Sequence, residues 1–76
     1  MKPITLEEAK QLKLGTTLYH VAFVNKDGSP QRWRVNGIPK IWKKNPSKVL
    51  VPIKNGLRNF SYLSEHVLNN FSLNIN

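Results

Sequence analysis

The fold is decided by residues 17–35, which read TLYHVAFVNKDGSPQRWRV. The first eight residues of this segment are rich in aromatic and β-branched side chains, a composition typical of a strand. Turn-forming residues follow, with the reversal expected at Asp27-Gly28, and residues 31–35 supply a return strand. The segment therefore predicts a long antiparallel hairpin in a β-rich domain.

The rest of the chain continues this pattern of short strands separated by turn signals. We expect further strands at 38–43, 48–54, 57–63 and 71–75, with turns at 36–37, 45–47 and 55–56 and one helical turn at 64–69. Pro39 and Pro52 each remove a backbone donor from a strand. Their strands should therefore lie at an edge, contain a bulge or point the missing amide to solvent.

A helix is predicted over residues 4–14, before the first strand. Thr5-Leu6-Glu7-Glu8 has the form of a capping box, in which the threonine hydroxyl and the second glutamate satisfy each other's backbone amides. An apolar stripe follows at a spacing of three residues, and Gly15 is a typical helix-terminating residue. We expect this helix to pack on one end of the sheet.

The 76 residues predict a single domain, residues 1–76, that is mainly β. A flat sheet of five or six short strands would leave both edges open, so closure into a small barrel over residues 16–76 is expected. The order of hairpins, helical turn and last strand favours an SH3-like barrel with an added N-terminal helix. An OB-like barrel is the alternative, but residues 45–47 are too short for the helix that it normally carries there.

The net charge of +8 is concentrated in the middle of the chain. Residues 26–58 contain nine lysines and arginines and a single acid, Asp27, whereas basic and acidic residues balance in the flanks. A concentrated positive field attracts an anionic partner, either a nucleic acid or an acidic protein surface. The same charge can instead serve only solubility.

Strand periodicity assigns this basic segment to faces, because residues two apart point the same way. If Trp33 and Val35 point inward, Arg32 and Arg34 project outward, where their planar donor groups can hold phosphates. Lys48 and Lys54 would extend the same surface on the strand predicted at 48–54. The simpler interpretation is that these charged side chains lie on a solvent-exposed strand face and bind no partner.

Trp42 shares a face with Lys40 and Lys44, while Lys43 lies on the other face. An outward Trp42 among lysines would offer stacking to an unpaired base while the ammonium groups contact phosphates. The alternative is a core tryptophan with lysines extending past it to water.

Other kinds of site receive little support from the sequence. There is no cysteine, and two histidines and four acids are spread along the chain, so neither a metal site nor a catalytic nucleophile is expected. Gly28, Gly37 and Gly56 lie singly in turns and form no phosphate-binding loop. We therefore expect no cofactor and no enzymatic activity. The absence of an apolar leader or membrane span predicts a cytoplasmic protein without a membrane partner.

Several segments resemble short uncharacterised proteins of tailed phages and prophages over roughly residues 5–68. These segments are residues 14–21, 25–37, 40–43 and 51–57. The resemblance implies a phage accessory protein acting in the bacterial cytoplasm. It supplies no catalytic residue and no established partner.

The sequence thus favours a non-catalytic module that binds DNA or RNA. The residues expected to contact the nucleic acid are Arg32, Arg34, Lys40, Trp42, Lys43, Lys44, Lys48 and Lys54. The alternative function is a protein-binding adaptor or modulator of a host factor, which docks its basic face on an acidic surface. Small barrels host both roles, so the fold class alone does not separate them.

Overall fold

The structure is a computed structural model, and it describes residues 1–75. One short α-helix precedes a six-stranded antiparallel sheet, which confirms the mainly β class and the N-terminal helix. The elements are α1 (Leu6–Lys10), β1 (Thr17–Val24), β2 (Pro30–Val35), β3 (Lys40–Ile41), β4 (Val49–Asn55), β5 (Asn59–Ser64), the 3-10 turn η1 (Leu68–Asn70) and β6 (Phe71–Ser72).

Strand β4 is the centre of the sheet, because it pairs with three other strands. It pairs with β5 along one edge, and its other edge is shared by β2 near Ile53 and by β3 near Leu50. Strands β2 and β3 thus act as one strand that is interrupted at residues 36–39. On the far side of β2 the order continues to β1 and then β6.

Pro52 explains where the interruption falls. Its carbonyl accepts a hydrogen bond from the Asn36 amide, so the side of Pro52 that lacks an N–H also faces residues 36–39. A strand there would lose a ladder bond, and residues 36–39 instead leave the ladder. The strand that contains Pro52 was expected to lie at an edge, to contain a bulge or to point its missing amide to solvent; β4 is the central strand and pairs with β5 without a break, so the interruption falls in its partner instead. Pro39 lies in this interruption and not in a strand.

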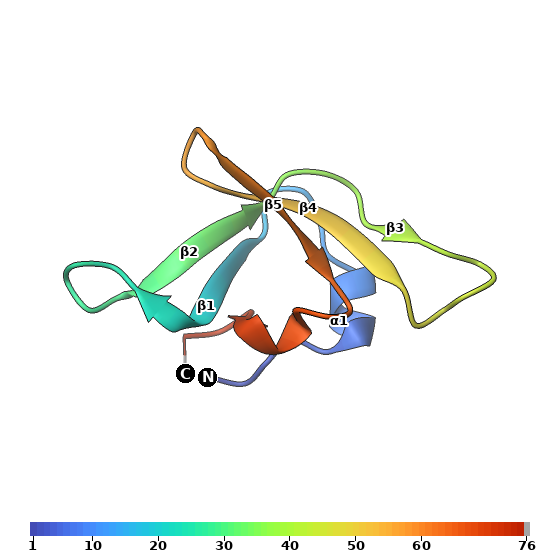
Figure 1. Ribbon diagram of the computed structural model, residues 1–76, viewed down its shortest axis with the longest axis horizontal. Helices are drawn as coiled ribbons and strands as arrows, with labels where there is room; N and C mark the ends of the chain where they lie inside the picture. Colours follow the sequence, from blue (N-terminus) through green and yellow to red (C-terminus); the bar gives the residue numbers. More distant parts are fainter. Residues whose placement is uncertain (76) are drawn as a thin grey trace.

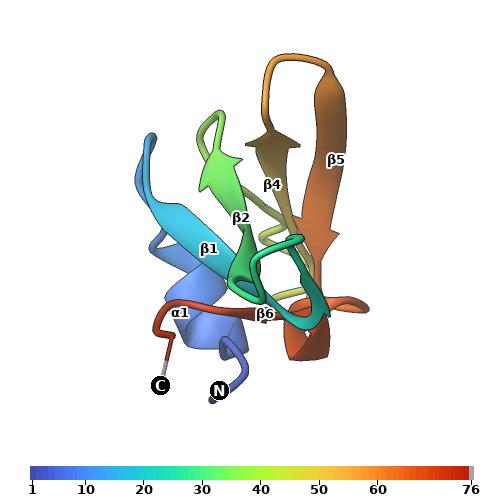
Figure 2. The same cartoon turned by 90° about the vertical axis from the view of Figure 1, so that its left-hand side faces the viewer.

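The expected closure into a barrel is not found, because the sheet is open. Within residues 1–75 no ladder joins β5 to β6, and β6 is only two residues long. Figures 1 and 2 show α1 and η1 on the same side of the molecule, near both termini, while the three hairpins point away in different directions. The helix α1 and the turn η1 pack on the apolar side of the sheet, which is therefore buried without closure into a barrel.

The helix is shorter than the predicted residues 4–14. Its capping box forms as expected, with Thr5 and Glu8 exchanging hydrogen bonds, but α1 ends at Lys10. Gly15 then adopts a φ of 88° and donates its amide to the carbonyl of Val35. This bond draws the chain onto β2, and Leu14 is consequently 72% exposed.

The last strand also ends early, at Ser72 instead of residue 75. The Ser72 hydroxyl donates to the Asn74 carbonyl and accepts from the Asn74 amide, at 2.8 and 3.2 Å. A serine side chain that satisfies nearby backbone groups in this way competes with strand pairing. The preceding helical turn, expected at 64–69, is found as η1 slightly later in the chain.

Strand β1 contains an irregularity centred on His20. Between the pairs Tyr19↔Arg32 and Val24↔Pro30 the register shifts, so several residues of β1 have no partner in β2. The imidazole Nδ1 of His20 accepts hydrogen bonds from the amides of Ala22 and Phe23, at 3.1 and 3.0 Å. The side chain thus replaces the ladder bonds that the distortion removes.

The core lies between the sheet and α1, on what we call the inner face. Val49, Val51 and Ile53 alternate along β4 and are buried, as the sequence predicted. The remaining buried apolar residues come from all parts of the chain: Ile4, Ala9, Leu12, Leu18, Val35, Leu63 and Phe71. The opposite side of the sheet, the outer face, carries the residues that alternate with these.

Candidate nucleic-acid interface

A transverse row of side chains crosses four strands on the outer face. The strand registers pair Thr17 with Arg34, Arg34 with Lys54, and Lys54 with Phe60. Thr17, Arg34 and Lys54 each lie next to a buried residue of their strand, which places them on the outer face. Phe60 shares that face, because it is the cross-strand partner of Lys54 and lies three residues before the buried Leu63. We call these four residues the outer row. Arg32 lies two residues before Arg34 on the same side of β2, opposite Tyr19.

The outer row contains two basic residues, Arg34 and Lys54, that are direct cross-strand partners. Cross-strand partners have Cβ atoms about 4.5–5.5 Å apart, and like charges in this position destabilise a sheet. The ion pairs found within residues 1–75 join Lys10 to Glu7 and His66 to Glu65, so no carboxylate neutralises the pair. An anionic ligand would relieve the repulsion.

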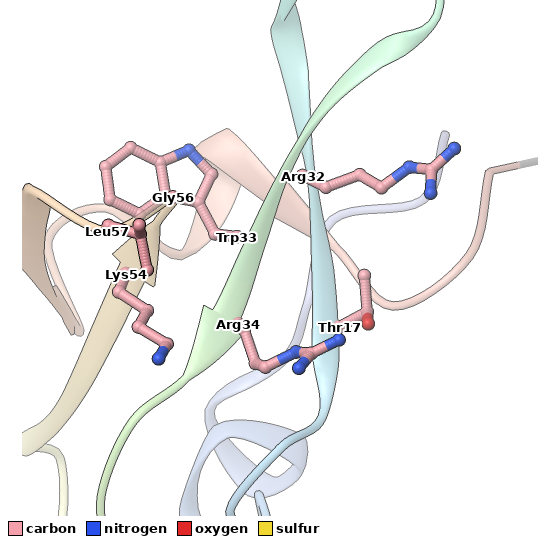
Figure 3. A pocket seen from close by; sticks show the side chains of 7 residues that line it. All are labelled: Thr17, Arg32, Trp33, Arg34, Lys54, Gly56 and Leu57. Atoms are coloured by element: carbon pink, nitrogen blue, oxygen red, sulfur yellow. The ribbon is translucent and has the colours of Figure 1, made fainter.

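A pocket lies beside this row, where β2 and the β4–β5 hairpin separate. Its lining residues are Thr17, Arg32, Trp33, Arg34, Lys54, Gly56 and Leu57. Figure 3 shows Arg32 and Arg34 extending to one side of β2 and Trp33 to the other, beside Gly56 and Leu57. The Asn55 side-chain amide donates to the Arg32 carbonyl at 2.7 Å and fixes the hairpin to β2.

Trp33 faces the core side of β2, as expected, but is only half-buried. Its ring makes an edge contact with Phe71, with 6.1 Å between ring centroids, and its indole N–H donates to Gln31. Trp33 therefore forms an apolar wall of the pocket, and Arg32 and Arg34 lie on the opposite side of β2 (Figure 3).

A second basic group surrounds Trp42 at the start of the β3–β4 hairpin. The ammonium groups of Lys40 and Lys48 lie 5.3 and 5.7 Å from the centroid of the Trp42 ring. We call these three residues the hairpin cluster. Trp42 is half-buried and is not among the core residues, so the alternative of a core tryptophan is wrong. However, Lys40 and Lys48 already lie over the Trp42 ring, so the ring is less available for stacking on a base.

The structure therefore divides the predicted site into two parts. Lys40 pairs with Leu50, and Leu50 and Lys54 share the outer face of β4 four residues apart, a separation of about 13 Å. Lys43 and Lys44 are exposed in the loop that follows β3, beyond the hairpin cluster. The basic residues thus extend along the outer face from the outer row toward one end of the molecule, instead of forming one compact patch.

Two aromatic residues belong to this face but were missed from the sequence. Phe60 and Tyr62 point outward from β5, and they are 64% and 58% exposed. Phe60 pairs with Lys54 and Tyr62 with Pro52, so both rings lie next to the basic residues. Alternation with the apolar Leu63 is the signal that could have found them, since it assigns residues 60 and 62 to the opposite face.

Other chemistry is sparse in the part of the chain that the structure describes. In residues 1–75 no three histidine or acidic side chains gather in a way that could hold a metal ion. His20 is buried among aromatic rings, and His66 is exposed beside Glu65. None of the helices within these residues is long and apolar enough to cross a membrane.

In comparisons with known proteins, no protein-family model, no curated protein and no solved structure matches the chain. The candidate site therefore depends on its own geometry and charge.

Proposed function

We propose that this protein is a non-catalytic nucleic-acid-binding module whose outer face contacts the phosphate backbone. The observation that carries the proposal is the cross-strand pairing of Arg34 and Lys54, neither of which forms an ion pair within residues 1–75. This arrangement costs stability in the free protein and is compensated by an anionic ligand. Arg32, Lys40 and Lys48 supply further positive charge along the same side of the sheet.

The order of elements supports a relationship to SH3-like barrels as part of this proposal. Strands β1, β2, β4 and β5 form a meander, and the chain then passes through η1 to a last strand that returns to β1. We interpret the sheet as an open variant of that architecture. In keeping with the resemblance to phage proteins, we place its action among phage accessory functions in the bacterial cytoplasm.

The salt dependence of binding tests the proposal. If about six phosphates are neutralised, the logarithm of the binding constant should fall against the logarithm of the salt concentration with a slope of roughly −4 for single strands or −5 for duplex. The double variant Arg34→Gln/Lys54→Gln should reduce the magnitude of this slope by about 1.4 for single strands. Lys10→Gln is a matched control, since Lys10 pairs with Glu7 on α1. Absence of binding at low ionic strength would contradict the proposal.

The adaptor function is the alternative, and capture of partners with and without nuclease treatment distinguishes it from nucleic-acid binding. An acidic protein surface is also attracted to the outer face. Recovery of one stoichiometric protein after nuclease treatment, by a chain that binds no oligonucleotide, would overturn the nucleic-acid proposal in favour of an adaptor. Loss of all captured material after nuclease treatment would support nucleic-acid binding.

A further inference from the structure

We infer that the nucleic acid bound by the outer face is single-stranded, and that its bases stack on Phe60 and Tyr62. This inference rests on the proposed function and names the ligand class of the same site. We call these two residues the aromatic pair. They were absent from the sequence-based site, and the register of β4 and β5 is what places them beside the basic residues.

The two rings of the aromatic pair are largely exposed and do not contribute to the hydrophobic core. Phe60 and Tyr62 lie outside the core, and within residues 1–75 neither ring packs in an aromatic pair with another ring. Being two residues apart on one strand, they are separated by about 7 Å along β5. Two ring faces at this separation can accept successive bases of a strand whose own bases are unstacked.

The charges lie where the backbone of such a strand would pass. Phe60 is the direct partner of Lys54, which is the direct partner of Arg34, so one ring and two cations follow each other across the sheet. A single strand can place a base on Phe60 and its phosphate near Lys54 at the same time. A duplex keeps its base faces inside the helix and can meet only the cations.

A shallow pocket with polar and apolar lining residues lies next to the aromatic pair. It is an open hollow of about 460 Å³, lined by Asn36, Pro52, Ile53, Phe60, Ser61 and Tyr62. Volumes of this order are typical of small-ligand sites. The backbone N–H of Asn36 donates to the Pro52 carbonyl, and the exposed side chain of Asn36 lines the pocket. Its carboxamide can donate to and accept from the edge of a base.

The aromatic pair can be tested without disturbing the core, because both rings are exposed. We would compare the wild-type protein with Phe60→Leu/Tyr62→Leu, which keeps apolar bulk but removes both rings. The probes are a fluorescent thymidine strand of about 12 nucleotides and an A·T duplex of the same length, within the range bound by small single-strand modules. Thermal unfolding of each variant verifies that the fold is retained.

We expect each lost ring to weaken single-strand affinity by about 5- to 150-fold and to leave duplex affinity and the salt slope unchanged. Tyr62→Phe retains a ring and should bind the single strand as the wild type does. Val24→Ala removes an exposed apolar side chain of the β1–β2 hairpin and serves as the control for general surface effects.

The outcomes separate this inference from the proposed function. Salt-dependent binding that is unaffected by Phe60→Leu/Tyr62→Leu would contradict stacking while leaving the nucleic-acid module intact. An equal loss of single-strand and duplex affinity would also contradict it, because stacking is specific to unpaired bases. Failure of the wild type to bind either probe at low salt would overturn both the proposed function and the inference that depends on it.

Discussion

His20 is the buried titratable side chain of β1, with 8% of its surface exposed. Burial lowers the pKa of the imidazole below its ordinary value. Protonation of Nδ1 would also remove the acceptor for the amides of Ala22 and Phe23. The unfolded chain therefore takes up this proton at a higher pH than the folded one. We expect the free energy of unfolding to decrease as the pH falls below about 6.5, and this decrease to end below the lowered native pKa.

Denaturant unfolding between about pH 8 and pH 5 measures this effect, since the window contains the ordinary pKa of histidine. His20→Asn keeps an acceptor near the position of Nδ1 but cannot titrate, so its stability should be lower overall and should depend less steeply on pH across the window. His66→Asn, which removes the exposed histidine beside Glu65, is the matched control. A wild-type slope in His20→Asn would show that another group is responsible. The carboxyls of Glu8 and Asp27 have pKa values lowered by hydrogen bonds and titrate at more acidic pH.

Trp42 supports a second prediction for a single side chain. Its contacts with Lys40 and Lys48 are cation–π interactions at a surface hairpin, worth about 0.5–1 kcal/mol each. Trp42→Ala should therefore lower the free energy of unfolding by about 1–2 kcal/mol and leave the domain folded. Trp33→Ala is the comparison, because Trp33 packs on the core and its loss should be larger. Unfolding of the Trp42→Ala variant in buffer would contradict the placement of this ring outside the core.

At the level of elements, the interruption between β2 and β3 depends on close packing of Gly37 on Pro52. A Cβ at Gly37 would lie 2.8 Å from Cγ of Pro52. Gly37→Ala should thus force residues 36–39 away from β4 and lower the free energy of unfolding by about 1–3 kcal/mol, measured by denaturant titration. In Gly37→Ala/Pro52→Ala the colliding atom is absent, so the two changes should be clearly non-additive, with part of the stability recovered. Additive losses would mean that the interruption has another cause.

The same elements indicate what the sequence could predict. The turns at Gly28 and Gly56 are local, since both glycines adopt positive φ values in the expected hairpins. The predicted ends of the helix and of the last strand were wrong, because they depend on hydrogen bonds that residue periodicity does not encode. These are the bond from the Gly15 amide to the Val35 carbonyl and the bonds of the Ser72 hydroxyl with Asn74. Alternation correctly placed Arg32 and Arg34 outward. The opposition of Arg34 and Lys54 required the register between strands about 20 residues apart, which no local pattern supplies.

At the scale of the whole molecule, no helix or second sheet within residues 1–75 covers the outer face, and that face carries much of the excess positive charge. A net charge of +8 on 76 residues destabilises the compact state through self-repulsion. The repulsion is greatest where like charges are fixed opposite each other. The placement of the charge is thus unfavourable for folding and favourable for binding an anion, the trade-off expected of a binding surface.

This trade-off predicts opposite effects of the same substitutions on stability and on binding. Arg34→Gln and Lys54→Gln should each raise the free energy of unfolding by about 0.2–1 kcal/mol at low salt, because each removes one of two opposed charges. The gain should shrink at high salt, where the repulsion is screened, and the two gains should not add, because either change relieves the same contact. The variants should bind oligonucleotides more weakly under the low-salt conditions that make them more stable. A stability gain that persists at about 1 M salt would show that the substitutions act through packing or strand propensity, and not through the charges of the outer row.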